Sequence, residues 1–288
     1  MLSSLAVIAA VPASRRLRRV ATALLVLAAG VPAPALAVTV SPTALFISAR
    51  SPSGILTLVN TGTRPEEVEL GFGFGYPVSD SIGVLRVDIV DSAGAGEPSA
   101  AGWLRAFPRR LVLQPGQRQL VRVTVVAPPG LADGQYWGRI LVKSRGGEPP
   151  IEQTQGQVRM QLTLETTFAA AVFFQKGAVT TGAAVRSTSA RRTAAGIEFD
   201  IDLARTGSAA FLGRVQADVV DARGVTHASV EDVVAVYRTL RRRFVATSEK
   251  ALPSGPLTVR WTVDTTRPDL PAQGPIRAAS VAGVTPVQ

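Results

Sequence analysis

Side chains that could carry out chemistry are scarce in this chain. Its 288 residues include no cysteine and a single histidine, His227, which lies in "ARGVTHASV" after a turn signal. One imidazole without a thiolate cannot build the usual transition-metal site. We therefore interpret His227 as a solvated loop or strand residue, with a catalytic base as the alternative. The sequence has neither a Gly-x-Ser-x-Gly elbow nor a Ser-x-x-Lys motif, so nucleophilic catalysis is not indicated.

Alternating carboxylates form the one arrangement that would suit a metal ion. In "EFDID", residues 198–202, a strand places Glu198, Asp200 and Asp202 on one face, where their oxygens could bind a hard cation. The favoured interpretation is that they form the wet face of a sheet and bind no metal. The stretch "GFGFG", residues 71–75, lacks the helix and the lysine that a phosphate-binding loop needs.

The only dense basic run is "RTLRRR", residues 238–243, which Tyr237 and Phe244 flank. A solvated strand face is the favoured interpretation, and contact with an anionic lipid or polysaccharide is the functional alternative. Nucleic acid is not expected as a partner, because the N-terminus resembles an export signal. From these residues we predict that the protein is not an enzyme and that it uses no catalytic residue, metal or cofactor.

Residues 1–37 have the organisation of a secretory signal peptide. A basic segment, "SRRLRR", precedes the apolar residues 20–31, and Ala35-Leu36-Ala37 forms a small-x-small cleavage site. The apolar run is too short to span a bilayer comfortably, so we predict Sec-type export to the periplasm and no stable membrane insertion after cleavage. An uncleaved anchor is the alternative. Without cysteine, folding of the exported chain depends on hydrophobic burial.

Period-two alternation of apolar and polar residues runs through the rest of the chain. In "IEFDIDLA" and "LTVRWTVD" every second residue is apolar, which is typical of strands with one buried and one wet face. Turn signals such as "QPGQ" and "LPSGP" separate these short runs, and helical spacers are missing. The pattern predicts an all-β protein with antiparallel sandwiches. "EDVVAVYRTLRRRF" also fits a helical spacing, and we predict strand-turn-strand there.

Breaks in this pattern suggest the domain boundaries. We predict a first immunoglobulin-like β-sandwich over residues 38–176 and a second, smaller one over residues 197–267. Residues 177–196 are small, polar and non-periodic, and they are assigned to the junction between the two domains, with a short strand inside it as an open alternative. Residues 268–288 are rich in proline, alanine and glycine and are assigned to a flexible tail.

The first domain resembles the N-terminal domain of the PapD-like periplasmic pilus chaperones. The strongest match is Pro115-Gly116 followed by Arg122-Val123, and the resemblance covers roughly residues 38–175. The segments that carry it follow the family's order: "VTVSPTALFI", "GILTLVNTGTRPEEVEL", "FPRRLVLQPGQRQLVRV", "GLADGQYWGRILV" and "VRMQLTLETTFAAAVFF". The second half of the chain is compatible with the family's second immunoglobulin-like domain.

The resemblance implies a way of binding another protein. In the family, the last strand of the first domain lends an apolar row to an incomplete pilin subunit by β-strand addition. The corresponding row here is Met160, Leu162 and Leu164, separated by polar residues. The alternative is that this row faces the domain's own core. The implied partners are a secreted, pilin-like client and an outer-membrane usher.

This chain departs from the family at the two cationic positions that hold a subunit's terminal carboxylate. The first-strand position falls at Ala44, and the late position in the last strand falls at Ala169 or Ala171, so neither carries a cation. The leading hypothesis is still a periplasmic chaperone or assembly factor. The alternative is a non-catalytic structural or adhesive module of the cell envelope, with an aromatic patch near Trp103, Tyr136 or Trp137.

Overall fold

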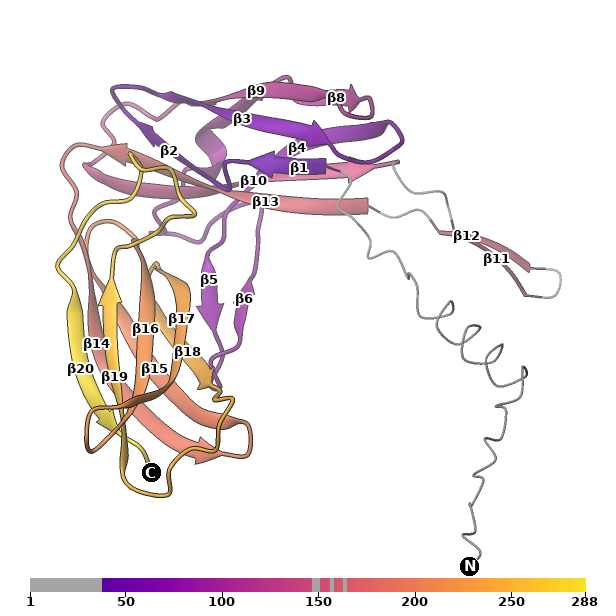
Figure 1. Ribbon diagram of the computed structural model, residues 1–288. Helices are drawn as coiled ribbons and strands as arrows, with labels where there is room; N and C mark the ends of the chain where they lie inside the picture. The colour runs from indigo at the N-terminus through magenta and orange to yellow at the C-terminus, as the bar shows by residue number, and fades with distance from the viewer. Residues whose placement is uncertain (1–37, 147–150, 156–157, 163–164) are drawn as a thin grey trace, which may run out of the picture. The chain divides into compact units, whose positions relative to one another are not determined.

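The computed structural model describes residues 38–146, 151–155, 158–162 and 165–288, and for 151–162 it describes the backbone only. The predicted signal peptide, residues 1–37, lies outside the described residues. Strands make up nearly all of the regular structure (Figure 1). Within the described ranges no helix has the length and apolar character needed to cross a membrane.

Two sheets pack face to face in the first sandwich. One has the order β1-β3-β9-β7 and the other the order β2-β13-β10-β4-β8, which matches the division of strands in immunoglobulin domains. The first sheet contains β1 (Val38–Ser41), β3 (Ser53–Asn60), β9 (Arg118–Val125) and β7 (Leu104–Phe107). The second contains β2 (Ala44–Ser48), β13 (Glu165–Lys176), β10 (Gly134–Arg145), β4 (Glu66–Gly73) and β8 (Arg110–Leu113).

Alternation along the strands fills the core between these sheets. Leu56 and Leu58 of β3 are fully buried, whereas Ile55 on the opposite face is 45% exposed. The Pro-Gly turn before β9 places Gly116 at φ +74°, a conformation that glycine adopts without steric cost. Asn60 closes the neighbouring turn, because its buried amide donates hydrogen bonds to the carbonyls of Arg64 (2.7 Å) and Leu113 (2.9 Å).

The second sandwich is also built from two antiparallel sheets. The order β14-β15-β18 comprises β14 (Thr181–Thr193), β15 (Gly196–Gly207) and β18 (Thr239–Ala246). The order β17-β16-β19-β20 comprises β17 (Thr226–Val236), β16 (Phe211–Asp221), β19 (Leu257–Asp264) and β20 (Val281–Pro286). The predicted strand-turn-strand is confirmed, since β17 and β18 flank Tyr237 and Arg238.

The structure differs from the predicted boundaries of this second domain. The predicted junction, residues 177–196, contains β14, and the predicted flexible tail, residues 268–288, contains β20. A register shift between Val185 and Ser187 breaks the alternation of β14 and hides its period. In β20 the inward positions include Gly283, which packs against Trp261, and Thr285, which accepts a hydrogen bond from the Trp261 indole (3.1 Å). Neither residue is recognisable as apolar in the sequence.

Aromatic side chains and one amide connect the two sandwiches. Trp137 of the first and Tyr237 of the second are both buried, and their ring centroids lie 4.8 Å apart. The buried Gln135 side-chain oxygen accepts hydrogen bonds from the Trp137 indole (2.9 Å) and from the Ala210 backbone N–H (3.0 Å). Because this buried acceptor is shared between donors of both sandwiches, it favours one defined arrangement at the contact.

Two short hairpins leave the sheets. The first, β5 (Pro77–Ser79) and β6 (Leu85–Val87), follows β4, and the second, β11 (Ile151–Gln155) and β12 (Val158–Leu162), precedes β13. The Arg241 backbone N–H of β18 donates to the Ser79 hydroxyl (2.7 Å), so the first hairpin lies beside the second sandwich (Figure 1). A one-turn 3-10 helix, Ala101–Trp103, precedes β7.

Candidate binding site: an open strand edge and a buried arginine

One stretch of β13 has a strand neighbour on one side and, among the described residues, none on the other. Its whole length, Glu165–Lys176, pairs with β10, whereas β2 pairs in parallel only with residues 171–175. Residues 165–170 therefore form an open edge of the five-stranded sheet. Such an edge presents backbone N–H and C=O groups that another strand can pair with.

The backbone groups on this edge can be assigned from the neighbouring hydrogen bonds. The Ala171 N–H donates to the Thr43 carbonyl (2.9 Å) and the Gln175 carbonyl accepts from Ala49 N–H (2.9 Å), so odd-numbered peptide groups face β2. Because these groups alternate along a strand, those of Thr167 and Ala169 face the open edge. The intervening Phe168 packs against the core of the first sandwich.

The predicted client-binding row, Met160, Leu162 and Leu164, is only partly within the described residues. Met160 and Leu162 lie in β12, where their backbones pair with Gln153 and Ile151 of β11. Their side chains and all of Leu164 lie outside the described residues. Client binding through this row stays a prediction. In chain order the row leads directly into the open edge of β13.

The positions at which the family has cations lie next to one another. Ala44 of β2 pairs with Ala171 of β13, which in turn pairs with Arg139 of β10. The pairing of Ala171 with Arg139 is one without direct backbone hydrogen bonds, because Ala171 N–H donates to Thr43. Side chains come closest in such pairs, and the small alanine leaves room for the guanidinium. A cation, Arg139, therefore lies on the strand next to Ala171.

Arg139 is a buried charge, with 9% of its surface exposed. Its Nε donates to the Gly75 carbonyl (2.8 Å) and its Nη2 lies 3.5 Å from the Tyr237 hydroxyl. In the described part of the chain no carboxylate lies within ion-pair distance of it. A buried guanidinium without a carboxylate is costly, and a bound anion would offset that cost.

A cavity of about 160 Å³ lies beside this guanidinium, between the two sandwiches. Arg267 also lines it, but a bidentate pair with Asp269 (2.6 and 2.7 Å) neutralises that side chain. Burial raises the pKa of the Tyr237 phenol, which therefore stays protonated as a hydrogen-bond donor. The cavity has one positive charge left over and suits a single anionic group. Its lining also includes Thr43, Ala44, Pro77, Ala171, Phe173 and Leu212.

Sequence reasoning missed Arg139 as a site residue. A signal was present, because "YWGRIL" is apolar on both faces except for this arginine. A charge in a strand that is otherwise buried on both sides needs a partner. The partner could not be identified from the sequence, since Tyr237 and Gly75 are far from Arg139 along the chain.

The carboxylates of "EFDID" pair with arginines of the neighbouring strands. Arg243 of β18 forms a bidentate pair with Asp200 (2.7 and 2.9 Å), and Arg241 lies 3.6 Å from Asp202. Glu198 pairs with Arg191 (2.5 Å) and Arg243 (3.1 Å). Arg241 and Arg243 of "RTLRRR" thus neutralise "EFDID" together with Arg191 of β14. Arg238 and Arg242 of the same run pair with Glu97 and Asp232. No group of metal-binding side chains is present in the described ranges.

The remaining sequence candidates have structural partners. His227 Nε2 lies 3.1 Å from the Asp221 carboxylate. Hydrogen bonds from the Val225 backbone and His227 lower the pKa of Asp221 to about 2. Of the aromatic residues in the alternative hypothesis, Trp137 is buried, and Trp103 and Tyr136 pack tilted against each other at 5.2 Å on the core of the first sandwich. They do not form an exposed patch.

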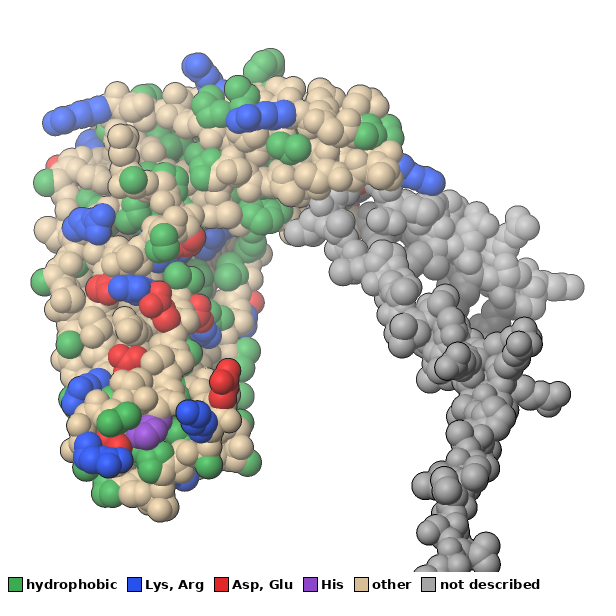
Figure 2. Space-filling view, viewed as in Figure 1, with side chains coloured by type: hydrophobic (Ala, Val, Ile, Leu, Met, Phe, Trp, Pro, Cys, Tyr) green, Lys and Arg blue, Asp and Glu red, His purple; other side chains and the backbone are tan. Residues whose placement is uncertain are grey.

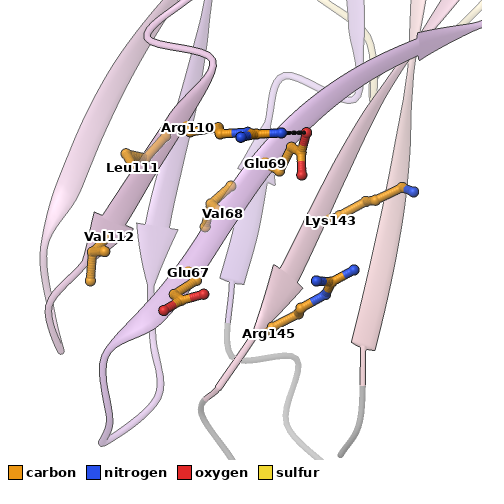
Figure 3. A pocket seen from close by; sticks show the side chains of 8 residues that line it. All are labelled: Glu67, Val68, Glu69, Arg110, Leu111, Val112, Lys143 and Arg145. Carbon is orange, nitrogen blue, oxygen red and sulfur yellow. Dashed lines mark hydrogen bonds and ion pairs between the residues drawn. The ribbon is translucent and has the colours of Figure 1, made fainter.

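A second cavity, about 570 Å³, lies on the outer face of β4, β8 and β10 (Figure 3). Its charges alternate across the strands: Glu69 lies opposite both Arg110 and Lys143, and Glu67 lies opposite Arg145. Arg110 donates a hydrogen bond to Glu69 (2.9 Å), which lowers the pKa of that carboxyl group. Opposite charges therefore face each other in this cavity, whereas Arg139 has no ion pair with a carboxylate among the described residues.

No family model matches the chain, and no curated protein matches it in sequence. Solved structures of pilus chaperones are similar to it. SafB of Salmonella enterica with the SafA pilin has a TM-score of 0.44 and 14% identity, covering 88% of this chain and 98% of that one. CupB2 of Pseudomonas aeruginosa has a TM-score of 0.40 and 10% identity, covering 87% and 100%. The CsuC–CsuE complex of Acinetobacter baumannii has a TM-score of 0.40 and 10% identity, covering 87% and 99%.

These likenesses concern the fold. The chain has two immunoglobulin-like sandwiches in tandem, as its own strand orders establish. All three TM-scores lie below 0.5 and all identities below 15%. Similarity of fold at this level does not define a function.

Proposed function

We propose that the protein is a periplasmic chaperone or assembly factor that binds a secreted, pilin-like client by β-strand addition. The observation that carries the proposal is the open edge of β13 at residues 165–170. A client strand would pair with the backbone groups of Thr167 and Ala169. The sequence resemblance to PapD-like chaperones supports the same use of this strand.

Arg139 lies at the end of the open edge. The open edge stops at Ala171, where β2 begins to pair, and Ala171 lies opposite Arg139. A client strand that follows the edge to this point would place its terminal carboxylate in the cavity beside the guanidinium. The carboxylate would neutralise the one unpaired buried charge there, in place of the cations that Ala44 and Ala169 or Ala171 do not provide.

The side chains of the client-binding row would add selectivity. Met160, Leu162 and Leu164 would fill an apolar groove of the client while the backbones form hydrogen bonds. This arrangement needs neither catalysis nor a cofactor. An outer-membrane usher that receives the client is the further partner we propose.

Leu162→Asp tests the contribution of the row. We expect this variant to bind the client about thirty-fold more weakly, because it loses the burial of a leucine side chain. Tagged wild type and variant are purified from periplasm, and the co-purified proteins are identified and quantified by mass spectrometry. Gln161→Asp is the matched control on the opposite face of the strand. Equal recovery of the same partners with wild type and Leu162→Asp would contradict strand donation by this row.

A further inference from the structure

Residues 82–90, which include β6 and the residues on either side of it, carry a cluster of exposed aliphatic side chains. Each is at least 36% exposed, and the set consists of Ile82, Val84, Leu85, Val87, Ile89 and Val90. Exposed apolar residues scattered singly need no explanation, but a cluster within one short segment marks an interaction surface. The proposed client site does not use these residues.

One edge of β6 is open. On its other edge β6 pairs with β5, with Leu85 opposite Ser79 and Val87 opposite Pro77. Val90 exchanges both of its backbone hydrogen bonds with Phe74 (2.7 and 2.9 Å). No other described strand pairs with β6, which ends its two-stranded sheet (Figure 1).

The direction of the backbone groups follows from these contacts. Val90 points its N–H and C=O toward β4, and the Val84 carbonyl accepts from the Asp80 N–H (3.1 Å) on the same side. Alternation then directs the peptide groups of Leu85, Val87 and Ile89 to the open edge. Pro77, which has no N–H, lies opposite Val87, as this assignment requires.

The sequence of this edge is complementary to itself. In "VLRVDIV", residues 84–90, an antiparallel copy related by a two-fold axis at Val87 places Leu85 opposite Ile89 and Val87 opposite Val87. These are the residues whose backbone groups face outward, so they form the hydrogen-bonded pairs. Arg86 falls opposite Asp88 of the second copy in both symmetry-related positions. Two apolar pairs, one central valine pair and two opposite-charge pairs result.

The two charges are available for such an exchange. Within one chain Arg86 Nε contacts Asp88 Oδ2 at 2.8 Å, and the two side chains are 64% and 65% exposed. In the paired arrangement, Arg86 and Asp88 of both copies lie on the same face of the joined sheet. An exposed ion pair within one strand contributes little to stability. Replacing it with ion pairs between the two copies therefore costs little free energy.

The hairpin is also held in place before any partner arrives. Gly83, at its turn, has φ +82° and lies so close to β18 that an added Cβ would be 2.8 Å from the Arg243 backbone nitrogen. Arg241 donates from its backbone to the Ser79 hydroxyl (2.7 Å) and from its guanidinium to the Ser81 carbonyl (3.1 Å). A preorganised edge loses less conformational entropy on pairing.

From this register we infer that β6 is a homodimerisation edge, whose partner is β6 of a second copy of this chain. The pairing joins the two hairpins into a four-stranded antiparallel sheet with a two-fold axis at Val87. A closed, two-fold interface uses the same edge on both copies and leaves none to grow further. The inference does not depend on the proposed client.

Opposite single charge reversals test the register. Arg86→Asp places two acidic residues opposite each other at both pairs, and Asp88→Arg places two basic ones there. We expect each variant to dimerise about thirty-fold more weakly than wild type. Mixed in equal amounts, the two variants should form a heterodimer, because acidic and basic residues then face each other. Neither variant has an ion pair between residues 86 and 88 of its own chain, so recovery on mixing reports contacts between chains.

Sedimentation velocity of the purified chain, from micromolar to millimolar concentration, measures these equilibria. Val233→Asp is the control for adding a charge to an exposed edge strand elsewhere, since Val233 is 44% exposed on the edge strand β17. The control should dimerise like wild type, and circular dichroism verifies that each variant is folded. A wild-type chain that stays monomeric throughout, or variants that dimerise equally well alone and mixed, would overturn the inference.

Discussion

Ala169→Pro is expected to weaken client binding strongly while leaving the first sandwich folded. The Ala169 N–H faces the open edge of β13, so proline removes a donor that only an added strand would use. Its ring also obstructs the approaching strand. We expect a loss of about a hundredfold in affinity, or ~3 kcal/mol. Binding is measured with the client recovered by co-purification, and folding by thermal unfolding.

Two neighbouring substitutions provide the controls for this experiment. Ala169→Ser keeps the N–H and should bind like wild type. Ala170→Pro removes a group that faces β10, where Ala170 pairs with Ile140, and should destabilise the fold itself by ~3 kcal/mol. If Ala169→Pro retains full client binding, the open edge is not where the client strand pairs.

Arg139→Met is expected to weaken client binding about a hundredfold, or ~3 kcal/mol, because it removes the charge-assisted contact to a terminal carboxylate. The free protein should keep its stability to within about 1 kcal/mol, since methionine also removes the cost of a buried, uncompensated guanidinium. Weaker client binding together with unchanged stability is the result expected of a residue that serves binding and not folding. Affinity is measured by titration calorimetry and stability by urea unfolding.

The client itself supplies the control for Arg139. A client with an amidated C-terminus should bind wild type as weakly as the unmodified client binds Arg139→Met. Combining the two changes should then cost little more than either one. Additive losses would show that Arg139 and the client's terminal carboxylate do not interact. Arg267→Met, at a side chain already neutralised by Asp269, should have a smaller effect on affinity.

The fold could be predicted where strands alternate regularly. "IEFDIDLA" places Ile197, Phe199 and Ile201 on one face, and all three are buried in the second sandwich. The prediction failed where inward positions are filled by small or polar residues. Gly283 and Thr285 face inward in β20 because the Trp261 side chain needs close backbone and a hydroxyl acceptor, and hydropathy does not record either requirement.

Only part of the candidate binding site could be predicted from the sequence. The sequence showed that Ala44, Ala169 and Ala171 carry no cation, and the structure places two of these beside each other as strand partners. It could not show that Arg139 lies opposite Ala171, because that depends on the register between β10 and β13. The neutralisation of "EFDID" by arginines likewise depends on the pairing of β15 with β18.

Hydrogen exchange at single amides of β13 in the purified client complex tests the central proposal most directly. The Phe168 and Ala170 amides face β10 and should exchange slowly with or without client. The Thr167 and Ala169 amides face the open edge, so they should exchange rapidly in the free chain and become protected in the complex. A saturated complex in which Thr167 and Ala169 exchange as fast as in the free chain would contradict strand addition at β13.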